Sequence, residues 1–302
     1  MNSFKKIVAG CALAAIPVVA NAQAPVELAL RLDDLGAFHS INKAALEVCR
    51  DGLAMSVEVI PVGQWFPEAA KMLNANPGID VGIHLTINSE WENAKWRPLT
   101  NCPSLVDDNG YFLPMMNKKA AYPGLSFAER GYNIKEVEQE FRAQIEFSLK
   151  NIPQITHLSG HMGSTCKNDE LCQLAQRLAD EYGLTLVDGT AQHQADHGFD
   201  FVWYDGPHKT LEQKEESFIK MLRNLSSTDK PGNRKMWLDH PAYNDSEMEN
   251  VFHVGYEDVA ADRQGVVDLL KSQKVKDAIK ELNIKLIPVS ALITNAPRAK
   301  NK

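Results

Sequence analysis

Two adjacent carboxylates, Asp33 and Asp34, end an apolar stretch of the sequence, Val26 to Leu35, whose alternation is typical of a β-strand. A buried strand rarely stops on paired acids, and Gly36 supplies a turn directly after them. Paired acids at a strand end can share the chemistry of a metal site, because one carboxylate can bind the ion while its neighbour accepts a proton from water. The competing interpretation is that both acids only begin a solvated loop.

Several histidines occupy a similar place, at or near the ends of later strand-like segments. They are His84, His157, His161 and His240. Two imidazoles and one carboxylate form a common ligand set for a divalent ion, and they leave positions for water and substrate. Each histidine alone also has a structural interpretation, as a hydrogen-bonded core residue, a supporting group or a loop cap. Their joint occurrence at strand ends favours the metal site.

The elements that must position these side chains alternate between strand-like and helix-like segments. Strands are expected at residues 26–35, 54–60, 80–86, 155–162, 185–188, 201–204, 235–239 and 285–288. Helices are expected near residues 40–52, 67–77, 133–149, 169–182, 210–225, 259–270 and 275–282. Ser40 is expected to cap the first helix, and Thr210 with Gln213 to form a capping box at the start of another.

This alternation predicts an α/β fold with a single domain, built as a distorted β/α barrel that resembles a TIM barrel with about seven strands. Reactive groups of such a barrel gather at the face where the strands end, so the acids and histidines should meet at one mouth. Residues 86–133 interrupt the alternation without a clear period and carry Trp91 and Trp96. A segment of this length is typical of a functional excursion, which the aromatic residues favour.

The first 22 residues resemble a secretory signal peptide, in which a basic start and an apolar run precede a small-x-small cleavage site at residues 20–22. The mature domain is then expected to span residues 23–302 and to be periplasmic or secreted. A lipoprotein anchored at Cys11 is the alternative, but the apolar run before this cysteine is short. The later sequence has no apolar run long enough to span a bilayer, so we expect no stable membrane insertion after cleavage.

The mature chain is expected to be acidic and to contain a disulfide. The net charge of −7 becomes −9 once Lys5 and Lys6 leave with the signal. Phosphate would repel such a chain, which argues against nucleic acid as a partner. Four cysteines remain after cleavage, and an even count in an exported protein permits disulfides. Cys166 and Cys172 are close in sequence and are the expected pair.

These residues together resemble the YdjC-like carbohydrate deacetylases, a family that includes chitooligosaccharide deacetylases and hopanoid-biosynthesis deacetylases. The resemblance covers residues 26 to about 290. Its marks are Asp33-Asp34-Leu35-Gly36 with Asn42, Gly82-Ile83-His84-Leu85, Pro103-Ser104-Leu105 with Gly110, Thr156-His157 with His161, His240-Pro241, and Arg263. Each motif is short, whereas their order and spacing are specific.

The resemblance implies a distorted β/α barrel and a divalent metal ion, zinc or magnesium, bound by Asp34, His84 and His161. It also implies that Asp33 is the general base that activates water. His240 would then be the general acid that protonates the leaving amine.

The sequence departs from the family motif at two positions. Ser159 stands where the family usually has an acid, and Gly163 where it usually has a histidine. These differences concern the substrate and the groups around the metal ligands more than the metal itself.

We therefore expect an exported, metal-dependent hydrolase that removes acetyl groups from an N-acetylated sugar or oligosaccharide. Two alternatives stay open, a non-catalytic glycan-binding relative and a metal-dependent hydrolase of O-esters or phosphoesters. The substrate sugar, the native metal and the assembly state, with a homodimer among the arrangements, also stay open at this stage.

Overall fold

The structure is a computed structural model that describes residues 25–205, 210–228 and 234–293. The predicted signal peptide, residues 1–22, and the lipoprotein alternative at Cys11 lie outside the described residues. Within the described part of the chain, no helix has the length and apolar character needed to cross a membrane.

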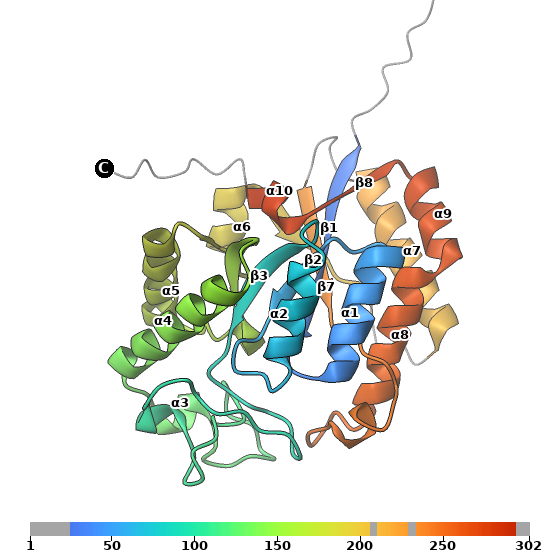
Figure 1. The fold of residues 1–302 in the computed structure, drawn as a ribbon. Helices are drawn as coiled ribbons and strands as arrows, with labels where there is room; N and C mark the ends of the chain where they lie inside the picture. Colours follow the sequence, from blue (N-terminus) through green and yellow to red (C-terminus); the bar gives the residue numbers. More distant parts are fainter. Residues whose placement is uncertain (1–24, 206–209, 229–233, 294–302) are drawn as a thin grey trace, which may run out of the picture.

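A curled parallel sheet forms the centre of the molecule (Figure 1). Its strands are β1 (Val26–Leu35), β2 (Ser56–Val59), β3 (Asp80–Leu85), β4 (Ile155–Gly160), β5 (Thr185–Leu186), β6 (Phe199–Phe201), β7 (Arg234–Asp239) and β8 (Ile284–Ile287). Seven strands follow the order β5-β4-β3-β2-β1-β7-β6, and β8 pairs with β1. Among the described residues β5 does not pair with β6, so the barrel is open on one side. The predicted fold, a distorted β/α barrel, is confirmed.

Strand β1 lies in the middle of the sheet because it is long enough to pair with three neighbours. Along one edge, β7 follows it in continuous register over residues 27–32. Along the other edge, β8 pairs with residues 26–29 and β2 with residues 31–35. Nine of its ten residues are buried, which explains the apolar run in the sequence. The acids at the end of β1 are thereby placed at the centre of the barrel mouth.

Helices connect the strands and surround the sheet (Figure 1). They are α1 (His39–Asp51), α2 (Phe66–Asn74), α3 (Phe127–Arg130), α4 (Ile134–Asn151), α5 (Asp169–Tyr182), α6 (Ala191–His197), α7 (Leu211–Thr228), α8 (Val259–Lys271), α9 (Gln273–Glu281) and α10 (Val289–Ile293). The long helices bury one apolar face each, as Val137, Phe141 and Ile145 do in α4. These side chains join the residues of β1 to β4 in one hydrophobic core.

The predicted helix starts have different outcomes. At α7, Thr210 and Gln213 form the expected box, because the backbone N–H of each donates to the side chain of the other. At α1 the prediction is wrong, since the helix begins one residue before Ser40. The Ser40 hydroxyl instead donates to Asp245, at 2.7 Å, and so ties α1 to a distant loop. The sequence does not predict α6 and α10, which have only 7 and 5 residues.

The excursion between β3 and α4 covers the end of the sheet where the strands stop, and Figure 1 shows it in teal to green at the bottom of the view. Trp96 is buried in it and donates its indole N–H to the carbonyl oxygen of Asn88 at 2.7 Å. Glu140 of α4 holds the excursion a few residues later, because its carboxylate accepts hydrogen bonds from the backbone N–H groups of Leu99 and Thr100. Trp91 lines the cavity at the mouth of the barrel. Trp91 therefore borders the cavity directly, and Trp96 packs edge-on against the ring of His161, with the ring centroids 6.0 Å apart.

Cys166 and Cys172 form a disulfide, as the sequence predicts. It links the loop after β4, which contains Cys166, to the first turn of α5, which contains Cys172. Cys49 and Cys102 are free thiols.

Replacing both Cys166 and Cys172 by serine should lower the free energy of unfolding by about 2 kcal/mol, because a cross-link of this loop size restricts the unfolded chain by about that amount. Urea unfolding with and without a reducing agent measures the effect. Reductant should weaken the native protein and leave the double variant unchanged. A native protein that is indifferent to reductant would contradict the disulfide.

Candidate active site

The two acids at the end of β1 face the same cavity because the strand is irregular there. Successive side chains of a regular strand point to opposite faces. Between Leu32 and Leu35 the register with β2 shifts, and Asp34 has a left-handed backbone with a φ of 71°. This conformation is uncommon for a residue with a Cβ atom and clusters at functional sites. Asp33 and Asp34 therefore both line the cavity at the barrel mouth.

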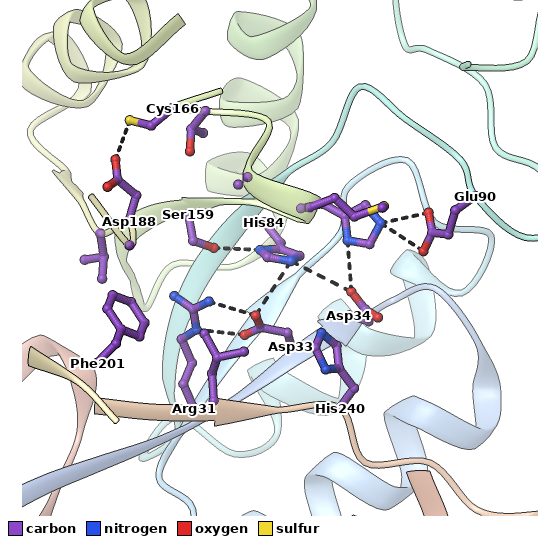
Figure 2. Close-up of a pocket in the computed structure, with 18 of the residues that line it drawn as sticks. Arg31, Asp33, Asp34, His84, Glu90, Ser159, Cys166, Asp188, Phe201 and His240 are labelled. Carbon is purple, nitrogen blue, oxygen red and sulfur yellow. Dashed lines mark hydrogen bonds and ion pairs between the residues drawn. The ribbon is translucent and has the colours of Figure 1, made fainter. Parts of the chain in front are cut away.

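Two histidines, one on β3 and one directly after β4, lie close to Asp34. Figure 2 shows His84 facing this acid. His84 of β3 places Nε2 3.8 Å from Asp34 Oδ1. His161, directly after β4, places Nδ1 3.2 Å from the same oxygen. The three donor atoms lie within 4.8 Å of one another, and all three residues are buried. The structure thus brings together the three residues that the sequence predicts as metal ligands.

This donor set fits a divalent metal ion. Asp34 Oδ1 is buried and has no hydrogen-bond partner among the described residues, although buried polar atoms normally have one. The other oxygen, Oδ2, accepts a hydrogen bond of 2.9 Å from Arg263. Burial raises the pKa of Asp34, but His240, Arg263 and His161 lower it by more, to well below its usual value. The site therefore offers an ionised carboxylate with one oxygen directed at two imidazole nitrogens, a set that suits zinc.

Glu90, in the excursion, holds the second nitrogen of His161. Its Oε2 lies 2.9 Å from His161 Nε2, which leaves Nδ1 directed at Asp34. Burial lowers the pKa of His161, but Glu90 and Asp34 raise it by more, to about 10. The negative potential that stabilises the imidazolium also favours a metal cation. The sequence does not predict Glu90, because it lies in a segment without periodicity, where its position before Trp91 is a weak signal.

Asp33 is held by Arg31, which lies two residues earlier on β1 and is also buried. Arg31 Nε and Nη2 each donate to one Asp33 oxygen at 2.7 Å. Such a bidentate pair fixes the plane of the carboxylate. Asp33 Oδ2 also lies 3.8 Å from His84 Nε2, so it faces the space that the donor atoms surround. The sequence signal for Arg31 is a cation inside an apolar strand, two residues before Asp33 and therefore on the same face.

His240 follows β7 and lies beside Asp34 in the cavity (Figure 2). Its backbone N–H donates to Asp239 Oδ1 at 2.8 Å, and its Nδ1 lies 3.6 Å from the same oxygen. Burial lowers the pKa of His240, but Asp34 and Asp239 raise it by more, so the net pKa is above its usual value. A histidine with a raised pKa keeps its proton to higher pH and is suited to donate it.

The cavity around these residues measures about 590 Å³ and combines the polar groups with aromatic and apolar walls. The wall residues are Trp91, Met162, Val187, Phe201, Trp203, Leu238 and Tyr256. The rings of Phe201 and Trp203 stack with their centroids 6.0 Å apart, and Trp203 is 61% exposed. An exposed aromatic face beside polar groups suits a ligand that has both apolar faces and hydroxyl or amide groups.

Both departures from the family motif have a place in this structure. Ser159 Oγ lies 2.7 Å from His84 Nδ1, so it contacts one of the predicted ligands. Gly163 has a φ of 73°, in the left-handed region that glycine adopts without strain. It belongs to the turn that directs His161 toward Asp34. His157, on β4, does not join the donor group, and its Nε2 lies 2.6 Å from Glu58 Oε1.

A second group of potential metal donors comprises the disulfide pair with Asp188 and His193. Asp188 Oδ2 lies 2.5 Å from His193 Nδ1 and contacts Cys166 Sγ. Metal binding by cysteine requires thiolates, and both sulfurs are joined in the disulfide. This group is therefore a disulfide packed against an aspartate–histidine pair.

The fold and the site define a class of protein, a distorted β/α barrel with a two-histidine, one-aspartate candidate metal centre at the mouth where the strands end. The chain belongs to the YdjC-like protein family, whose sequence pattern matches residues 27–281. The resemblance found in the sequence is therefore confirmed.

Individual relatives cover different shares of the chain. A carbohydrate deacetylase of Enterococcus faecalis is 27% identical over 276 residues, which are 88% of this chain and 98% of the relative. A carbohydrate deacetylase of Thermus thermophilus is 34% identical over 157 residues, which are 52% of this chain and 51% of the relative. A crystal structure from Enterococcus faecalis, described as a proposed cellobiose-phosphate cleavage protein, has a TM-score of 0.71 and 24% identity, covering 90% and 100% of the two chains. This structural likeness supports the fold.

Zinc content should separate the ligands from the neighbouring acid. Replacing Asp34, His84 or His161 by alanine removes a donor, so bound zinc should fall at least about tenfold, because too few strong donors remain. Asp33→Asn should keep its zinc, since Asp33 is already held by Arg31. Elemental analysis after dialysis measures the content. If Asp33→Asn loses zinc while Asp34→Ala keeps it, the two acids have the opposite roles.

Proposed function

We propose that this protein is an exported, metal-dependent deacetylase that hydrolyses the acetamide group of an N-acetylated sugar or oligosaccharide. Family membership supports this function, as do the relatives that are named carbohydrate deacetylases. Export rests on the signal-like residues 1–22. The observation that carries the proposal is Asp33, a second buried carboxylate fixed beside the predicted ligands by Arg31.

Amide hydrolysis needs a base that accepts a proton from water and an acid that protonates the amine as it leaves. Asp33 is placed for the first task, because Arg31 fixes its orientation and its Oδ2 faces His84 Nε2. When bound by Asp34, His84 and His161, zinc or magnesium supplies Lewis-acid activation of the water and of the acetyl carbonyl.

His240 is placed to act as the acid. It lies beside Asp34 in the cavity, and the carboxylates of Asp34 and Asp239 raise its pKa despite burial. Proton donation matters more for an amine than for an alcohol leaving group, because an amide nitrogen leaves only when protonated. This feature favours an amide over an ester substrate.

The aromatic wall suggests how the sugar would be bound. Sugar rings have apolar C–H faces, which pack on aromatic rings, and polar edges, which form hydrogen bonds. Trp203 presents such a face at the cavity, and Phe201 supports it by stacking. The cavity volume of about 590 Å³ is in the range of small-molecule sites. This wall would also serve a glycan-binding protein without catalysis, so activity decides between the two.

The zinc-loaded protein should release acetate from chitooligosaccharides or peptidoglycan-type sugars, and a chelator should abolish the release. Asp33→Asn should lower kcat by about 100-fold or more with zinc retained, as expected when a positioned base is lost. Acetate and phosphate assays run side by side measure the reaction. Failure to release acetate from any acetylated sugar would contradict the proposal. Sugar binding that is indifferent to Asp33→Asn would indicate a glycan-binding protein, and phosphate release a phosphoesterase.

The pH profile should report the proton held by His240. Only the imidazolium can donate, so kcat should fall as the pH rises through the raised pKa of this group. His240→Ala should retain zinc, lower kcat by about 100-fold and weaken this alkaline limb. Asp33→Asn is the matched control, because it should keep the limb at a reduced rate. An unchanged alkaline limb in His240→Ala would assign the acid to a different group.

A further inference from the structure

A buried chain of hydrogen bonds leads away from His84, on the side opposite to the donor group. His84 Nδ1 lies 2.7 Å from Ser159 Oγ. A dashed line marks this contact in Figure 2. The Ser159 hydroxyl donates to Glu58 Oε2 at 2.5 Å. Glu58 is fully buried on β2, and Ser159 and His84 are 1% and 2% exposed. The catalytic roles proposed above do not use Glu58.

The second carboxylate oxygen of Glu58, Oε1, is also held by neighbouring side chains. Glu58 Oε1 lies 2.6 Å from His157 Nε2 and 3.8 Å from Arg31 Nε. Burial raises the pKa of Glu58, but His157 and Arg31 lower it by more, to about 2. Gly82 makes room for this pair, because a Cβ atom there would collide with both Glu58 and His157. The result is an ionised carboxylate in the core behind the candidate metal centre.

The number of protons on these groups fixes which group donates and which accepts in each hydrogen bond between His84, Ser159 and Glu58. An ionised carboxylate only accepts hydrogen bonds, and a serine hydroxyl has one proton to donate. Since Ser159 donates that proton to Glu58, its oxygen must accept one from His84. His84 then carries its proton on Nδ1, and the lone pair of Nε2 is directed at Asp34 Oδ1, 3.8 Å away. This is the tautomer that can bind a metal through Nε2.

We propose that Glu58 is a positioning residue that acts through Ser159 to hold His84 in its metal-binding tautomer and orientation. The inference rests on the proposed function, in which His84 is a ligand. It also accounts for the departure at position 159, where the family usually has an acid. In this chain the carboxylate comes from β2 and reaches the imidazole through a hydroxyl on β4.

Glu58→Gln should reverse the direction of the hydrogen bonds from residue 58 through Ser159 to His84. Its carbonyl oxygen would still accept from His157, so its NH₂ group would face Ser159 and donate to Oγ. The Ser159 proton would then be free to point at His84 Nδ1, which places the His84 proton on Nε2. That tautomer has no lone pair for the metal, although the shape of the core is preserved.

The test measures affinity for zinc by competition with a chelating indicator, together with the visible spectrum of the cobalt(II)-loaded protein. Glu58→Gln and Ser159→Ala should each weaken zinc binding about 10- to 100-fold and alter the cobalt spectrum. Glu140→Gln is the matched control, because Glu140 is equally buried but holds the excursion backbone. It should bind zinc like the native protein.

A rescue variant distinguishes positioning from general destabilisation. Glu58→Gln combined with Ser159→Asp places a carboxylate directly beside His84 Nδ1, where Ser159 Oγ lies in the native protein. Zinc affinity and the cobalt spectrum should therefore recover toward the native values. Native-like affinity in Glu58→Gln, or equal loss in Glu140→Gln, would overturn the positioning role and leave the proposed function intact. A native protein that binds neither zinc nor magnesium would overturn both.

Discussion

The left-handed backbone at Asp34 brings the two acids of β1 into one cavity, and the other parts of the site are arranged around it. Extended backbone would send Asp33 and Asp34 to opposite faces of the sheet. Arg263 stabilises the unusual conformation by donating to one oxygen of Asp34, while the other oxygen faces His84 and His161. Helix α8 thus helps to hold the end of strand β1, more than 200 residues earlier in the sequence.

The sequence predicts the site residues that lie at the ends of strands. Apolar residues mark β1, β3 and β7, and the acids and histidines stand where these strands end, so their meeting follows from the parallel barrel alone. Arg31 would also have been predictable from its place in an apolar strand. Glu90 was not, because it reaches His161 from a segment whose path depends on buried tryptophans and backbone hydrogen bonds.

Long-range partners account for the remaining differences. Ser40 has the residue type of a helix cap, but its hydroxyl bonds to Asp245, and no local pattern indicates a partner 205 residues away. Similarly, the motif around Ser159 indicates only that this chain lacks the acid that the family usually has at this position. The structure shows a carboxylate behind it, contributed by Glu58 from a different strand. Local motifs therefore predict which residues line the barrel mouth. They predict less well which charged residues from other strands hold those residues in place.

The open side of the barrel lies between its two shortest strands. Strand β5 has two residues and β6 has three, and across the described residues each pairs with only one neighbour. A long unpaired strand would present a row of free N–H and C=O groups, to which another chain could add and start aggregation. Strands this short present few such groups. The barrel can thus stay open beside its cavity without exposing an edge on which intermolecular sheets would grow.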